Sequence, residues 1–122
     1  MTVKDLNPNQ YITTEIQLQN LEKLAEAISG LEILMNREFY VTSGLRSMSD
    51  QMRINPAVLN SSHLHGSAVD LLDVDGSIDS WCVSNLDALI RLGLYLESPT
   101  ETPRWSHLQI TPPKSGRRVF LA

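Results

Sequence analysis

The chain has one cysteine, Cys82, so it can form no internal disulfide and cannot build a zinc site from several thiolates. A chain without disulfides is typical of a reducing compartment. No apolar run approaches the roughly 20 residues that cross a bilayer, and the N-terminus lacks the apolar stretch of a signal peptide. We therefore expect no membrane partner and synthesis in the cytoplasm without an export signal.

The chain also lacks a cluster of basic residues. Its formal net charge is -4, and its most basic stretch is the short segment 114–118. Because nucleic-acid binding depends on a lysine and arginine stripe, we expect no nucleic-acid partner. The length of 122 residues suits one domain with a real core. We expect a single domain over 1–122, with the polar residues 1–12 as an entry loop.

Hydrophobic spacing predicts two main helices. The first runs from about residue 14 to between 29 and 35, because Thr14 and Gln17 have the spacing of a capping box. Its apolar residues recur at helical intervals: Leu18, Leu21, Leu24, Ala25, Ile28 and Leu31. The second helix is expected from residue 77 or 79 to Gly93, with an inner face of Leu86, Leu89 and Ile90.

Runs of β-branched and aromatic residues predict short strands between these helices. The expected strands are 39–42, 68–74, 94–96, 105–110 and an edge strand at 119–121. Residues 47–62 and 97–104 are expected to be loops. The predicted fold class is α+β, with a small antiparallel sheet and two main helices.

Two histidines and an aspartate lie where a metal site would need them. His63 ends the polar loop, Asp70 follows seven positions later in a strand, and His107 lies on another strand. Imidazole and carboxylate groups bind zinc, and three such ligands leave one position for water. Zinc lowers the pKa of that water from about 15.7 to about 7, which supplies a nucleophile for amide hydrolysis. On spacing alone, ordinary hydrogen-bonded structural roles remain an alternative for all three.

Three motifs resemble those of the zinc D-Ala-D-Ala metallopeptidases and their relatives. The pattern Ser-x-His-x-x-Gly-x-Ala-x-Asp occurs at residues 61–70. It is preceded by Ser-Gly-x-Arg at residues 43–46 and followed by Trp-x-His at residues 105–107. The group includes bacterial D,D-carboxypeptidases, vancomycin-resistance dipeptidases, phage L-alanyl-D-glutamate endolysins and the zinc fold of hedgehog signalling domains. The motifs span about residues 39–110 in the order of the family.

The resemblance implies roles for individual residues. His63, Asp70 and His107 would be the zinc ligands. Arg46 would hold a carboxylate or carbonyl of the substrate, which suits a guanidinium fork. Ser43 is expected to support the turn that carries Arg46, although it also belongs to the candidate substrate site. His65 fills a variable position and is expected to be solvated.

The chain departs from the family pattern at the catalytic base. Catalytic members carry a glutamate or aspartate shortly before the last histidine, often three positions before it. Here that position is Arg104, which cannot accept a proton. The nearest upstream carboxylates are Glu101 and Glu97, and these are the candidate bases. A missing base would cost about 10²–10⁴-fold in rate.

Two functions follow from these observations. The first is a zinc peptidase that hydrolyses the stem peptides of bacterial peptidoglycan, as a D,D-carboxypeptidase or an endolysin. Such a protein would be phage-encoded, and it would be released at lysis or carried in a virion. The second is a non-catalytic zinc module, structural or peptidoglycan-recognising, for example in a phage tail. The motifs and Arg46 favour the enzyme, whereas Arg104 favours the module.

Overall fold

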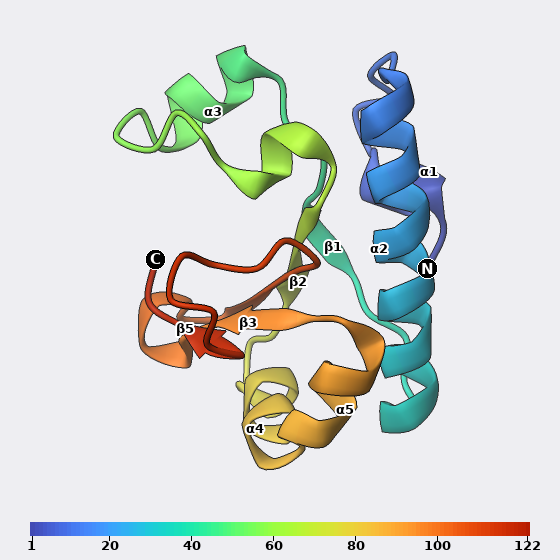
Figure 1. The fold of residues 1–122 in the computed structure, drawn as a ribbon, viewed down its shortest axis with the longest axis vertical. Coiled ribbons are helices and arrows are strands. Elements are labelled where there is room, and N and C mark those ends of the chain that lie inside the picture. The colour runs from blue at the N-terminus through green and yellow to red at the C-terminus, as the bar shows by residue number, and fades with distance from the viewer.

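The computed structural model describes all residues from 1 to 122, and its fold is α+β as predicted. Figure 1 shows a long helix, α2, along one side of a small sheet, with α4 and α5 packed together at one end. The elements in chain order, with η marking 3-10 turns, are α1 (Val3–Leu6), α2 (Glu15–Met35), β1 (Val41–Ser43), α3 (Met48–Ile54), η1 (Ser62–His65), β2 (Ala68–Leu72), α4 (Ser77–Ser84), α5 (Leu86–Leu92), β3 (Tyr95–Glu97), η2 (Pro99–Glu101), β4 (Trp105–Gln109) and β5 (Val119–Phe120).

The sheet has five strands in the order β1-β2-β4-β3-β5. The pairs β1–β2, β2–β4 and β4–β3 are antiparallel, which agrees with the predicted antiparallel sheet. The last pair, β3–β5, is parallel and makes the sheet mixed. The parallel pair was not predicted. It forms because the connection 110–118 crosses β3, so that β5 adds to the far edge of that strand. In this order the three inner strands, β2, β4 and β3, each have a neighbour on both sides.

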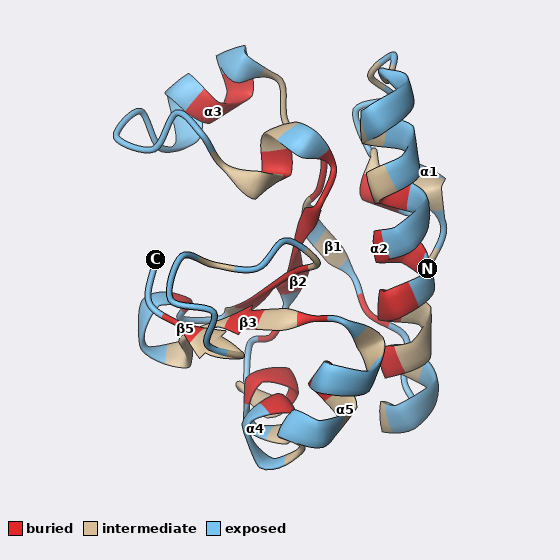
Figure 2. Ribbon diagram, viewed as in Figure 1, coloured by how far each residue is buried: buried red, intermediate tan, exposed pale blue.

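Helix α2 supplies much of the core, as its predicted stripe requires. Figure 2 shows the buried residues on one stripe of the helix. They are Leu21, Leu24, Ala25, Ala27, Ile28 and Leu31, while Leu18 is 40% exposed. Gly30 does not end the helix, which continues to Met35. A Cβ at Gly30 would lie 2.6 Å from Leu92 Cδ2, so this glycine lets α5 approach closely.

The second predicted helix is divided into two at Asn85. This residue has φ -131° and ψ 51°, outside the helical region, and its side chain donates to the Trp81 carbonyl at 2.8 Å. The break changes the direction of the following turn. As a result Leu89 is fully buried but Leu86 and Ile90 are exposed, so the predicted inner face is correct at only one of its three positions.

Two predicted loops contain short helices. The expected entry loop 1–12 includes α1, which begins at a capping box formed by Thr2 and Asp5. The expected loop 47–62 includes α3, which begins at a similar box of Ser47 and Asp50. Both boxes have Asp where the usual pattern has Glu or Gln. No helix is both long and apolar enough to cross a membrane.

Candidate metal centre

The register of two central strands brings Asp70 and His107 together. Strands β2 and β4 are antiparallel, and Asp70 lies directly opposite His107. Directly opposed residues project from the same face of a sheet, so the two side chains meet there. His107 Nδ1 lies 2.8 Å from Asp70 Oδ1.

His63 reaches the same point from the 3-10 turn η1, just before β2. Its Nε2 lies 3.3 Å from Asp70 Oδ1. The turn ends at Gly66, which has φ +74°, in the left-handed region that favours glycine. A Cβ there would also lie 2.9 Å from the Gln17 carbonyl oxygen. Gly66 thus lets η1 close against α2 and points His63 inward.

The three side chains form a group that can hold a metal ion. One candidate ligand atom from each lies within 4.8 Å of the others. The two imidazole rings are 5.1 Å apart between centroids and inclined by 69°. His63 is 2% exposed, Asp70 8% and His107 9%. Two imidazoles and a carboxylate are a donor set that suits zinc.

Hydrogen bonds to the outer ring nitrogens support this use of the histidines. His63 Nδ1 lies 2.9 Å from the Gly44 carbonyl oxygen, and His107 Nε2 lies 2.7 Å from Gln109 Oε1. Both oxygens accept hydrogen bonds, so each outer nitrogen carries a proton. Metal-binding histidines are commonly oriented in this way. The inner nitrogens, His63 Nε2 and His107 Nδ1, therefore face the shared point.

The charges of the site are strongly coupled. Burial lowers the pKa of His63. Burial also opposes ionisation of Asp70, but the neighbouring imidazoles, first the hydrogen bond from His107, outweigh it and hold the pKa of Asp70 well below its usual range. In His107 burial is outweighed by the bond to Asp70, which raises the pKa of His107. The Asp70 carboxylate is thus the fixed negative charge of the group.

Three hydrogen bonds hold Arg46 beside the group, and one of them reaches Asp70. Its Nη2 donates to Asp70 Oδ2 at 3.2 Å, its Nε to Ser43 Oγ at 2.9 Å and its Nη1 to Gln51 Oε1 at 3.0 Å. These bonds use three of the five N–H groups of the guanidinium. Two N–H groups remain for another acceptor beside the group.

The pairing of β3 with β4 brings only one of the two candidate bases, Glu97, directly beside His107. Leu96 pairs with Leu108, so Glu97 lies beside His107 across the strands. Glu97 Oε2 is 4.0 Å from His107 Nδ1. Burial, together with the nearby Glu101 carboxyl, raises the pKa of Glu97 to about 7. Glu101 itself is exposed on η2, and its Oε2 accepts a hydrogen bond from the Ala122 N–H at 3.0 Å.

Other residues of the sequence motifs lie outside the group. Arg104 is exposed, has φ +75°, and donates no hydrogen bond to the three side chains. Its carbonyl oxygen accepts from the Asp73 N–H at 2.9 Å. His65 is exposed as expected, with Nε2 3.2 Å from Asn60 Oδ1. Arg104 therefore does not replace the base that the family pattern carries at this position.

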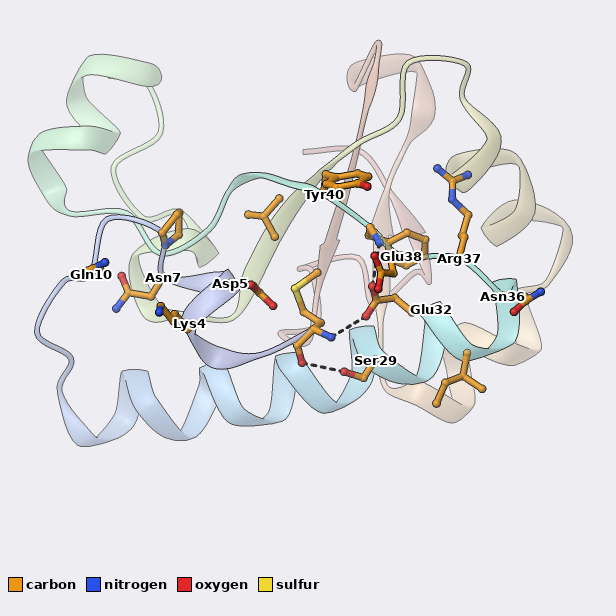
Figure 3. A pocket seen from close by; sticks show the side chains of 15 residues that line it. Lys4, Asp5, Asn7, Gln10, Ser29, Glu32, Asn36, Arg37, Glu38 and Tyr40 are labelled. Atoms are coloured by element: carbon orange, nitrogen blue, oxygen red, sulfur yellow. Dashed lines mark hydrogen bonds and ion pairs between the residues drawn. The ribbon is translucent and has the colours of Figure 1, made fainter.

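A broad surface hollow of about 1150 Å³ lies elsewhere, between α1, the end of α2 and the segment that leads into β1 (Figure 3). Among its polar contacts, the Met1 amino group donates to Glu32 Oε1 at 2.8 Å. Glu32 Oε2 accepts from the Phe39 N–H. These bonds tie the chain together, and none of the lining residues belongs to the group of His63, Asp70 and His107. The converging polar groups at the sheet, rather than this hollow, mark the candidate site.

The sequence alone did not identify three supporting groups. The Gly44 carbonyl, Gln109 and Gln51 orient His63, His107 and Arg46 respectively. Gln109 was the easiest to foresee, because residues two apart on a strand share a face and it follows His107 at that interval. The other two depend on tertiary contacts.

Comparisons with known proteins bear on the fold. No protein-family profile matches the chain, and no curated protein matches it. Among solved structures, the chain is similar to the crystal structure of the L-Ala D-Glu endopeptidase ChiX from Serratia marcescens. The likeness covers 92% of this chain and 99% of that chain, with 23% sequence identity and a TM-score of 0.51. At this identity the likeness shows that the two chains share a fold.

Proposed function

We propose that the protein is a zinc-dependent peptidase that hydrolyses the stem peptides of bacterial peptidoglycan. The observation that carries the proposal is the convergence of His63, Asp70 and His107. The outer ring nitrogens of both histidines are already hydrogen-bonded, and Glu97 lies beside His107. The shared fold with an L-Ala D-Glu endopeptidase supports the substrate class, and makes L-Ala–D-Glu the first bond to test.

The three ligands suit zinc because they combine two imidazoles with one ionised carboxylate. When bound, zinc would polarise the scissile carbonyl and activate a water molecule for attack on it. The chain must then supply a group that accepts the proton and a group that orients the peptide. Both lie next to the ligands.

Glu97 is the proposed base. It lies at the edge of the ligand group, near His107, whereas Glu101 is exposed and bonded to the C-terminal residue. Burial raises the pKa of Glu97, and a carboxyl with a raised pKa suits a group that must accept and then return a proton. Glu97 would take the proton from the attacking water and deliver it to the leaving amine.

Arg46 is the proposed anchor for the substrate. Its bonds to Ser43 and Gln51 fix the plane of the guanidinium, and its two remaining N–H groups can hold a carboxylate of the stem peptide. Ser43 acts through Arg46 in this role. Such positioning holds the scissile bond next to Glu97 and the metal.

The alternative is a non-catalytic zinc module that recognises peptidoglycan. The observation that favours it is the exposed Arg104 at the position where the family pattern carries the base. The two proposals differ in whether Glu97 acts on a substrate.

Digestion of purified peptidoglycan separates them. The enzyme should release new amino groups, lose this activity with a chelator and regain it when zinc is restored. Mass spectrometry of the products identifies the bond that is cut. A zinc-loaded protein that binds peptidoglycan but releases no product would exclude the peptidase and leave the module.

A further inference from the structure

Two buried carboxyl groups share one hydroxyl on the face of the sheet opposite the metal-binding group. Asp73 is 2% exposed, Asp79 is 5% exposed and Ser106 is fully buried. Ser106 precedes His107 on β4, and neighbouring residues of a strand point to opposite faces. The cluster therefore lies behind the strand that carries His107, against helix α4.

The two short distances from Ser106 Oγ to the carboxyl oxygens require two protons, one for each hydrogen bond. Ser106 Oγ lies 3.0 Å from Asp73 Oδ2 and 2.6 Å from Asp79 Oδ1. A hydroxyl has only one hydrogen to donate. If both carboxyls were ionised, one of them would face a lone pair of the hydroxyl at hydrogen-bond distance without a proton between them. One of the two carboxyls must therefore supply the second proton.

The backbone decides which carboxyl is ionised. Asp73 accepts from the Ile78 N–H at 2.9 Å and the Asp79 N–H at 3.0 Å, in the first turn of α4. Two N–H donors at the N-terminal end of a helix stabilise an anion there. Asp79 accepts no backbone N–H, and its other contact is the Thr102 hydroxyl at 3.4 Å.

We propose that Asp79 is a neutral carboxylic acid in the folded protein and a positioning residue for strand β4. Its Oδ1–H donates to Ser106 Oγ, and the Ser106 hydroxyl donates to the Asp73 carboxylate. This relay joins α4 to β4. The Thr102 hydroxyl, at the end of η2, donates to the same Asp79 carboxyl. The relay therefore holds β4 from one face of the sheet, while His107 projects from the opposite face of the same strand.

The charges around Asp79 agree with this assignment. Burial raises the pKa of Asp79, and the negative charge of Asp73 adds to the effect. The Cys82 thiol, whose pKa burial raises to about 12, is neutral. Asp75 and Arg104 line the same surface hollow as Asp79, but neither donates a hydrogen bond to its carboxyl.

The pH dependence follows from the raised pKa. Folding favours the protonated form of Asp79, so its contribution to stability is complete below about pH 3.8, the usual pKa of aspartate. It is lost as the pH rises from there through the pKa of Asp79 in the folded state. The Asp79→Asn variant carries an amide that donates to Ser106 at every pH, so it should escape this loss.

The experiment is a carbon-detected NMR titration of the aspartate side-chain carboxyls in the full chain. Asp79 should titrate clearly above pH 3.8, the usual pKa of aspartate. At pH 7, Asp79→Asn should melt at or above the temperature of the unaltered protein, and Asp73→Asn, the matched control, should melt lower. A titration of Asp79 at or below its usual pH, or an Asp79→Asn protein that melts well below the unaltered protein, would overturn the proposal.

A second readout tests positioning rather than stability alone. Asp79→Ala removes the relay, so the ring signals of His107 should shift in that variant and return in Asp79→Asn. Unchanged His107 signals in a folded Asp79→Ala protein would refute the positioning role. The NMR titration uses the unaltered protein, so it decides the protonation state even where a variant fails to fold. Neither arm depends on zinc or on catalysis.

Discussion

The Gly44 carbonyl oxygen lies 2.9 Å from His63 Nδ1 and fixes which nitrogen of that imidazole carries the proton. A carbonyl can only accept, so Nδ1 donates, and Nε2 is left with its lone pair facing Asp70 and His107. Gly44 itself has no room for a side chain, because a Cβ there would lie 2.2 Å from the Leu6 carbonyl oxygen. The position of the ring thus depends on the approach of two backbone segments.

Replacement of Gly44 by alanine should destabilise the protein and disturb His63. The Cβ would meet backbone atoms of Leu6, which cannot move as a flexible side chain does. We expect a loss of about 1–3 kcal/mol in the free energy of unfolding, together with weaker zinc binding. Urea denaturation and a zinc titration measure the two effects. Gly76→Ala is the control for zinc affinity: it should also cost stability, because its φ of +72° strains an alanine, but nothing lies within 4 Å of a Cβ there, so zinc binding should be unchanged. Unchanged zinc affinity in Gly44→Ala would show that the Gly44 carbonyl does not orient His63.

Removal of the Gln109 amide should weaken metal binding without a large change in fold. Gln109 accepts from His107 Nε2 at 2.7 Å and donates to the Thr111 carbonyl at 2.7 Å. Loss of such a partner typically lowers metal affinity or activity by about 10–100-fold. Calorimetric titration of Gln109→Leu with zinc checks this expectation. An affinity equal to that of the unaltered protein would mean that His107 is held by β4 alone.

Glu97→Gln and Glu101→Gln form a matched pair for the catalytic base. Glutamine keeps the shape of the side chain but cannot take the proton. We expect Glu97→Gln to lower the rate of peptidoglycan hydrolysis by about 10²–10⁴-fold while zinc remains bound. Glu101→Gln should have the smaller effect, because its carboxyl accepts from the Ala122 N–H and acts on the reaction only through the pKa of Glu97. The reverse order of effects would assign the base to Glu101.

The Tyr11 hydroxyl should contribute to stability in a way that depends on pH. It donates to Asp50, and this bond, followed by the Ser47 N–H, lowers the pKa of Asp50 to about 2. A depressed carboxylate pKa stabilises the folded state above the usual value of 3.8, and the effect is lost as the pH falls towards 2.

Tyr11→Phe should therefore cost about 1.5–3 kcal/mol at pH 7, the range for a hydrogen bond to a charged group. The difference from the unaltered protein should shrink between pH 4 and pH 2. Denaturant unfolding at several pH values measures it. A deficit that is the same at pH 2 as at pH 7 would mean that lost packing, rather than the bond to the carboxylate, causes it.

The sequence predicted that His63, Asp70 and His107 meet, because much of the information for this arrangement is local. The segment that holds His63 and Asp70 spans residues 61–70, and its small residues indicate the tight turn that Gly66 makes. His107 followed from a third motif on a predicted strand. The helix break at Asn85 was missed because an asparagine interrupts a helical pattern only when its side chain finds a competing partner, here the Trp81 carbonyl.

The choice between Glu97 and Glu101 depends on strand register, which is not visible in one sequence. Glu97 is ten positions before His107, farther than Glu101, yet the pairing of Leu96 with Leu108 brings it beside the histidine. The supporting roles of the Gly44 carbonyl and Gln51 could not be predicted for a similar reason, because their hydrogen-bond partners come from other elements. Distance along the chain was a poor guide to which glutamate lies beside His107.

A calorimetric titration of the chelator-treated full chain with zinc tests the metal site most directly. The convergence of His63, Asp70 and His107 predicts one zinc per chain, with binding lost in His63→Ala and retained in the exposed control His65→Ala. Absence of binding in the unaltered protein, or binding that survives His63→Ala unchanged, would contradict the site on which the proposed function rests.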